Sequence, residues 1–81
     1  MKYFKNINNT LTAKFAFENF QEALKFINNI WNIAESSNHH PDILLHDYKY
    51  VTITTTTHDA GNKITQKDYT IAEKIESHYI T

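Results

Sequence analysis

Residues 11–34 read LTAKFAFENFQEALKFINNIWNIA, and the spacing of the apolar side chains changes in the middle of this stretch. From Leu11 to Phe17 apolar residues occupy every second position, which is the period of a half-buried β-strand. From residue 20 onward they recur at intervals of three and four, the period of one helix face. The residues on that face are Phe20, Ala23, Leu24, Ile27, Ile30, Trp31 and Ala34. The stretch therefore predicts a strand that leads into a helix, with the whole stripe, Trp31 included, packed in the core.

The ends of this helix are also indicated by the sequence. Asn19 is a favourable N-cap, and Glu22 stands at the position from which a capping box reaches back. The helix is expected to fray over residues 36–38, and Pro41 then prevents its continuation because it disfavours helical backbone at His40. The predicted helix therefore ends just before two consecutive histidines.

Strands are predicted on both sides of the helix. Residues 3–7 form a first strand, and Asn8-Asn9 tolerates the positive φ of a tight hairpin into the strand that begins at Leu11. Residues 43–45 and 48–57 form two more strands around a turn near Asp47, and the second of these is rich in β-branched residues. Four strands are therefore expected in two consecutive pairs.

A second helix is predicted near the end of the sequence. Residues 59–63 form a loop that contains the only glycine, and Thr65 then caps a helix with Asp68 at the capping-box position. The apolar stripe of this helix consists of Ile71, Ala72, Ile75 and Tyr79. The predicted order is β-β-α-β-β-α, an α+β fold of two layers within one domain of residues 1–81. Strands that arrive as hairpins favour a four-stranded antiparallel sheet with both helices packed on one face.

Composition excludes several classes of function. The net charge of −1 is unfavourable for a nucleic-acid surface, and the absence of cysteine excludes disulfides and thiol chemistry. No signal peptide and no membrane-spanning stretch is apparent, so a cytoplasmic protein is expected. The open sheet edges of so small a domain favour self-association.

The residues best suited to chemistry lie at the ends of two different elements. His39 and His40 follow the predicted helix, His58 ends the predicted strand, and Glu35 lies in the last turn of the helix. Imidazole gives and takes protons near neutral pH, so convergence of these groups would suit general acid–base chemistry on a small molecule. The two other histidines, at positions 46 and 78, are interpreted as surface residues.

The same residues carry a family resemblance. Glu35 is followed by three residues and then by His39-His40-Pro41, and Tyr48, His58 and Asp68 follow at fixed intervals. In this pattern, and over roughly residues 11–78, the chain resembles the pterin-4a-carbinolamine dehydratase family. It departs from many members at residues 61–65, where Gly-Asn-Lys-Ile-Thr is one residue longer than a Gly-Gly-Leu-Thr-like segment, at Ile43, which is aromatic in some members, and in beginning later in the family's sequence.

The resemblance implies a hydro-lyase that dehydrates 4a-hydroxytetrahydrobiopterin to quinonoid dihydrobiopterin in tetrahydrobiopterin recycling. It implies neither a metal nor an organic cofactor, and it implies a homodimer or homotetramer. His39 and His58 are then the acid–base pair, His40 joins them as a catalytic residue that mainly binds and orients the pterin, and Asp68 supports the site as a helix cap. The implied pterin-binding residues are Glu35, His39, His40, Pro41, Thr57, His58, Asp59 and Ala60.

Three other hypotheses about the function remain open. A metal site on the three histidines lacks a helical His-x-x-x-His pattern. A non-enzymatic role, as a dimerisation cofactor or transcriptional coactivator, would use a helix surface, as in some animal relatives. An RNA-binding sheet is disfavoured by the charge.

Overall fold

The structure, a computed structural model, describes residues 1–80. Its elements follow the predicted order β-β-α-β-β-α, with one short 3₁₀ helix added before the last helix. They are β1 (Lys5–Ile7), β2 (Thr10–Ala16), α1 (Phe20–Ser37), β3 (Asp42–His46), β4 (Tyr50–Thr55), the 3₁₀ helix η1 (His58–Ala60) and α2 (Gln66–Ile80). The α+β class is confirmed.

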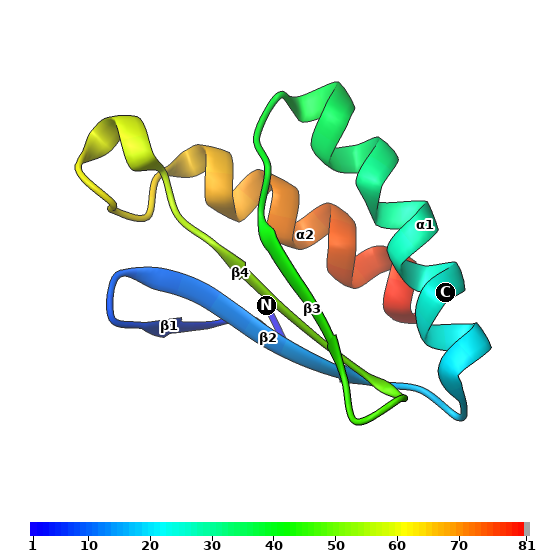
Figure 1. Ribbon diagram of the computed structural model, residues 1–81. Coiled ribbons are helices and arrows are strands. Elements are labelled where there is room, and N and C mark those ends of the chain that lie inside the picture. The colour runs from blue at the N-terminus through cyan, green and yellow to red at the C-terminus, as the bar shows by residue number, and fades with distance from the viewer. Residues whose placement is uncertain (81) are drawn as a thin grey trace.

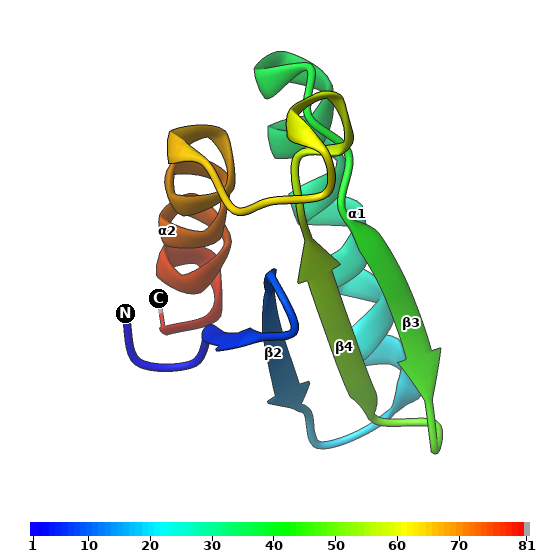
Figure 2. The same cartoon turned by 90° about the vertical axis from the view of Figure 1, so that its left-hand side faces the viewer.

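The four strands form one antiparallel sheet in the order β1-β2-β4-β3. Asn8 and Asn9 connect β1 to β2 with φ values of 51° and 62°, as expected for a tight hairpin. The longest ladder joins β2 to β4 and runs from the pair Leu11–Thr55 to the pair Ala16–Tyr50. Both helices lie on one side of this sheet, as Figures 1 and 2 show.

The core lies between the sheet and the helices. Phe15 of β2 and both Val51 and Ile53 of β4 are fully buried, and each such side chain contributes about 1.5–3 kcal/mol through burial. The helices contribute buried apolar side chains at helical spacing, namely Ala23, Phe26, Ile30 and Ala34 from α1, and Ile71, Ala72 and Ile75 from α2. These two rows fix which side of each helix faces the sheet.

Trp31 is not part of this core, and the prediction that placed it there was wrong. Its side chain is 53% exposed, and Phe20 and Leu24 of the same helix are 50% and 39% exposed. The side of α1 that faces the sheet carries positions 23, 26, 30 and 34. The apolar arc of the helix is wider than this row, so the sheet does not cover all of it. The flank of α1 therefore presents large apolar side chains to solvent.

The first strand is shorter than predicted, because the residues before it bond to a side chain. The backbone N–H groups of Lys2, Tyr3 and Phe4 donate to the carboxylate of Glu76 on α2 at 3.1, 2.7 and 2.8 Å. Glu76 is only 8% exposed. Burial alone raises the pKa of Glu76, but the three N–H donors outweigh it and lower the pKa below its ordinary value. The N-terminal segment is thus attached to α2, and the sheet begins only at Lys5.

The predicted strand 48–57 is also shorter at both ends. Asp47 and Tyr48 have φ values of 50° and 54°, so they form the turn, and β4 starts at Tyr50. After Thr55 the chain leaves the sheet, and Thr57 pairs only with Lys63 across η1. The end of β4 and the end of α1 consequently lie at the same end of the molecule (Figure 1). No helix among residues 1–80 is long and apolar enough to cross a membrane.

Candidate active site

The end of α1 directs the two consecutive histidines into different surroundings. Asn38 ends the helix in the left-handed region (φ 50°), and its N–H bonds to the carbonyls of Ala34 and Glu35. This local stop is typical of helix C-termini and turns the chain sharply. The Nε2 atom of His40 then bonds back to Glu35 at 2.8 Å on the exposed surface, while His39 points to the interior.

His39 contacts a carboxylate that is completely buried. Its Nε2 atom lies 2.7 Å from Oδ1 of Asp68, in the first turn of α2, and the side chains are 12% and 0% exposed. The same oxygen accepts a hydrogen bond from Thr55 at 2.7 Å. The other oxygen, Oδ2, accepts from the hydroxyl of Thr57 at 2.7 Å and from the N–H of Thr65 at 2.9 Å. These five residues are called the Asp68 cluster below.

The Asp68 cluster holds its carboxyl group ionised. Burial alone raises the pKa of Asp68, but hydrogen bonds, with that of His39 the largest and that of Thr55 next, lower the pKa from 3.8 to about 2. An ionised carboxylate only accepts hydrogen bonds, so Nε2 of His39 must carry a hydrogen. In neutral His39 the lone pair is then on Nδ1, for which the described residues provide no partner. His39 is therefore oriented to exchange a proton at Nδ1.

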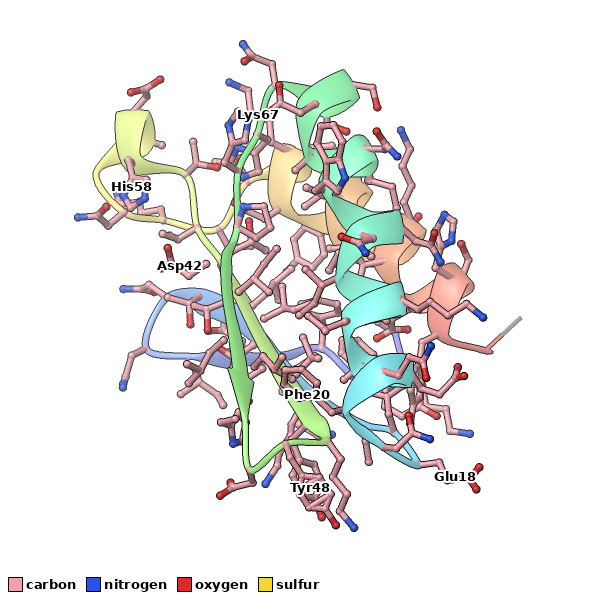
Figure 3. The ribbon with its side chains drawn as sticks, turned by 45° about the vertical axis from the view of Figure 1, so that its right-hand side comes forward. Glu18, Phe20, Asp42, Tyr48, His58 and Lys67 are labelled. Carbon is pink, nitrogen blue, oxygen red and sulfur yellow. The ribbon has the colours of Figure 1, made fainter. Side chains whose placement is uncertain are left out.

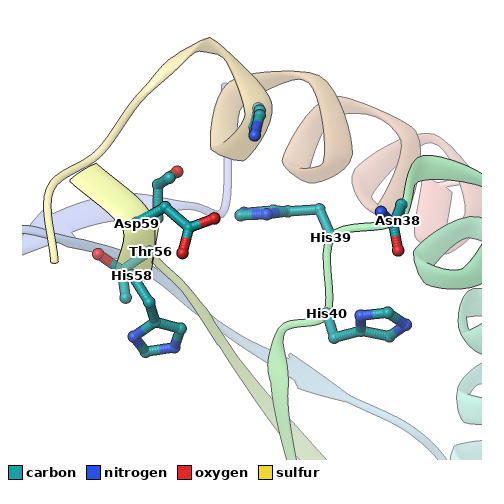
Figure 4. A pocket seen from close by; sticks show the side chains of 8 residues that line it. Asn38, His39, His40, Thr56, His58 and Asp59 are labelled. Atoms are coloured by element: carbon teal, nitrogen blue, oxygen red, sulfur yellow. The ribbon is translucent and has the colours of Figure 1, made fainter. Parts of the chain in front are cut away.

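A hollow of about 260 Å³ opens beside His39 and is lined by residues from three parts of the chain. They are Asn38, His39, His40, Thr56, Thr57, His58, Asp59 and Lys67. This volume is close to the lower limit of small-molecule pockets, about 300 Å³, and suits a compact ligand. In Figure 4 the ring of His39 extends toward the side of the hollow formed by Asp59, whereas the ring of His40 turns the opposite way.

His58 lines the same hollow from the other side, at the start of η1. It is exposed, and its Nδ1 atom lies 2.7 Å from Oδ1 of Asn62, so Nδ1 donates and Nε2 is left for another partner. The rings of His58 and His39 do not face each other in Figure 4.

The other predicted site residues are distributed unevenly. Thr57 and Asp59 line the hollow, and Ala60 lines an adjoining one of about 390 Å³ that shares Thr57 and Asp59. Glu35 and Pro41 line neither of these hollows, and Glu35 is linked to the first one by its contact with His40.

Tyr48, the aromatic residue of the family pattern, lies far from this hollow. It is 60% exposed and sits in the β3–β4 turn, at the opposite end of the sheet from His58 (Figure 3). Its place in the sequence pattern therefore does not correspond to a place in the hollow.

Three residues of the lining were not among the predicted site residues. Asn38, Thr56 and Lys67 each stand next to a predicted residue along the chain, and that adjacency was the only signal. Thr55 was also not assigned a role, because a threonine in an otherwise apolar inward row gives no sign of its hydrogen-bond partner. Thr65 was predicted as a helix cap, and the structure shows that its N–H donates to Asp68, as a capping box requires.

Size alone would select a different hollow, but that hollow lacks the cluster of histidines. A larger hollow of about 460 Å³ lies between α1 and α2, but His78 is its only histidine. Among residues 1–80, no group of three or more His, Cys, Asp or Glu side chains is arranged to hold a metal ion. A carboxylate behind an imidazole, as Asp68 lies behind His39, is an arrangement that can support proton transfer.

Comparison with known proteins defines the family. A histidine that contacts a buried aspartate beside a small hollow is typical of acid–base sites. Residues 3–78 match the family described as pterin 4 alpha carbinolamine dehydratase. The chain belongs to this family. A protein of Picosynechococcus sp. is 46% identical over 66 residues, which are 82% of this chain and 70% of that protein. One of Sulfurisphaera tokodaii is 42% identical over 76 residues, 94% and 80% of the two chains. Both carry the name pterin-4-alpha-carbinolamine dehydratase provisionally.

Solved structures agree on the fold. The structure described as a transcriptional coactivator/pterin dehydratase from Brucella melitensis superposes with a TM-score of 0.88 at 26% identity, covering 98% of this chain and 84% of that one. A pterin dehydratase-like protein described as a RuBisCO assembly factor of the alpha-carboxysome has a TM-score of 0.74 at 18% identity, covering 94% and 86%. The second likeness concerns the fold alone.

Proposed function

We propose that this protein dehydrates a 4a-hydroxytetrahydropterin, such as 4a-hydroxytetrahydrobiopterin, to the quinonoid dihydropterin and water. The observation that carries the proposal is the contact between His39 and Asp68 at the edge of the small hollow. Membership of the pterin carbinolamine dehydratase family supports the choice of substrate class.

The reaction requires two proton transfers: N5 loses a proton, and the hydroxyl group on C4a gains one. A base removes the proton from N5, the electron pair forms the N5–C4a double bond, and the C4a–O bond breaks. An acid protonates the departing hydroxyl group, which leaves as water. We assign the base to Nδ1 of His39, because Asp68 stabilises the imidazolium that forms, and the acid to Nε2 of His58.

The remaining residues are assigned to binding. His40, held by Glu35, orients the pterin at the mouth of the hollow, and Pro41 fixes the backbone direction there. Asp59 and Ala60 meet the ring edge from the side of η1. The hydroxyl hydrogen of Thr57 is already donated to Asp68, so Thr57 acts through the Asp68 cluster.

An ultraviolet assay with freshly generated 4a-hydroxytetrahydropterin tests the proposal. Purified protein should accelerate the appearance of the quinonoid product well above the rate in buffer, without added metal or cofactor. A rate equal to that in buffer would remove the dehydratase assignment.

We also propose that the protein associates as a homodimer or homotetramer. The exposed Phe20, Leu24 and Trp31 give α1 an apolar flank, and such flanks are typical of interaction surfaces. The alternative function, a non-enzymatic interaction protein, would use the same flank. It leaves the Asp68 cluster unexplained, so we place it second.

A further inference from the structure

Thr55 occupies a position where the strand pattern calls for an apolar side chain. It follows Val51 and Ile53 in the row of β4 that faces the helices, and it is only 2% exposed. A buried hydroxyl group costs free energy unless it forms a hydrogen bond. The hydroxyl of Thr55 donates to Oδ1 of Asp68, the oxygen that His39 also contacts.

The contacts at the two carboxylate oxygens are evenly divided. Oδ1 of Asp68 accepts from Thr55 and His39, and Oδ2 accepts from Thr57 and Thr65. A carboxylate has about four acceptor sites, so all are in use. Rotation of the group would break at least one of these bonds, each of which is charge-assisted. The carboxylate is therefore held in one orientation by β4, by the chain before α2, and by His39.

Thr55 differs from the other two threonines in what it contacts. Thr57 bonds to Thr65 at 2.6 Å, so these two form a pair that would still hold Oδ2 without Thr55. Only Thr55 shares an oxygen with the imidazole. The charged and titratable groups that line the hollow with His39, which are His40, His58, Asp59 and Lys67, form no hydrogen bond with Asp68 among the described residues.

We propose that Thr55 is a positioning residue for His39: its hydroxyl occupies one acceptor site of Oδ1 and so fixes the direction from which Nε2–H of His39 approaches. This direction sets where the Nδ1 atom of the same ring points. The consequence for catalysis rests on the proposed function, whereas the effect on the ring itself does not.

Three variants separate the effect of the Thr55 hydroxyl group from the effect of the side chain's shape and place in the strand. Thr55→Val removes the hydroxyl at constant shape, and Thr55→Ser keeps it. Thr54→Val is the matched control, because Thr54 lies on the opposite face of the same strand, and its hydroxyl is 3.5 Å from that of Thr12. Circular dichroism checks the fold of each, and Thr55→Ala serves as the deletion if the valine variant does not fold.

Two measurements are made on each variant. In Thr55→Val the NMR signal of the His39 ring N–H should shift and exchange faster with water, and kcat should fall about tenfold with KM little changed. Thr55→Ser and Thr54→Val should resemble the wild type. An unchanged ring signal in Thr55→Val would overturn the proposal, and so would an equal change in Thr55→Ser. If the ring signal changes but the wild type turns over no pterin, the positioning role stands and the proposed function fails.

Discussion

The Nε2 atom of His39 lies 2.7 Å from Oδ1 of Asp68, although the two residues are 29 positions apart and belong to different elements. One follows α1, the other lies in the first turn of α2, and α1 and α2 pack against each other over the same side of the sheet. The histidine that borders the hollow thus owes its orientation to a residue that solvent does not reach. This relationship connects the stability of the fold with the chemistry of the site.

Asp68 should make stability depend on pH in the acid range. Its pKa is about 2 in the folded protein and 3.8 ordinarily, so its ionised form stabilises the fold above pH 3.8, and this contribution disappears as the pH falls toward 2. The difference corresponds to about 2 kcal/mol. Denaturant unfolding from pH 6 to pH 2 should show this loss in the wild type and its absence in Asp68→Asn, which is less stable at pH 6. The exposed Asp42→Asn serves as the control, and parallel curves for wild type and Asp68→Asn would contradict the prediction.

Glu76→Gln should loosen the N-terminal segment. The glutamine amide has one acceptor oxygen, which can accept from Tyr3 and Phe4 or from Lys2 but not from all three, so at least one hydrogen bond is lost, at a cost of about 1–3 kcal/mol. Hydrogen exchange at the amides of residues 2–4 should accelerate, while β2 and β4 stay protected. Glu73→Gln, at an exposed position of the same helix, should leave exchange unchanged. Equal protection of residues 2–4 in both variants would be evidence against the attachment.

His58→Ala should lower turnover without lowering stability. The side chain is exposed, and among residues 1–80 it bonds only to Asn62, so its removal leaves no buried group unpaired. Loss of a positioned proton donor should reduce kcat by about 10²-fold or more. His78→Ala, which removes an exposed histidine outside this hollow, should retain wild-type kcat. A His58 variant with wild-type kcat would exclude this residue as the acid.

Trp31→Glu should weaken self-association. The indole is 53% exposed on the apolar flank of α1, and a carboxylate there would be desolvated in an interface between copies. Sedimentation should show a dimer or tetramer for the wild type, a smaller species for Trp31→Glu, and no change for Asn32→Glu on the neighbouring exposed position. A monomeric wild type, or an unchanged mass for Trp31→Glu, would contradict association through this flank.

The sequence predicted most of the fold, because each element carries a clear local pattern. The alternation from Leu11 onward and the helical spacing from Phe20 onward both correspond to observed elements. The position of Trp31 was missed because periodicity gives the apolar arc of a helix but not the width of the sheet that covers it. The start of β1 was missed because it depends on Glu76, which is more than 70 residues away.

The residues of the candidate site also differ in whether the local sequence pattern indicated them. The histidines were found because their spacing forms a pattern along the chain, and three of them do line one hollow. Asp68 was interpreted as a helix cap, which it is, but its contact with His39 arises only when α1 and α2 pack together. Thr55 had no local signal, since its role depends on a partner 13 residues away.

The turnover of His39→Gln tests the central claim most directly. The glutamine amide nitrogen can take the place of Nε2 and donate to Asp68, so the Asp68 cluster should stay intact, but the side chain cannot exchange a proton. With 4a-hydroxytetrahydropterin as substrate, we predict a kcat lower by about 10²- to 10⁴-fold at nearly unchanged stability. A His39→Gln protein that folds and dehydrates this substrate at the wild-type rate would contradict the account.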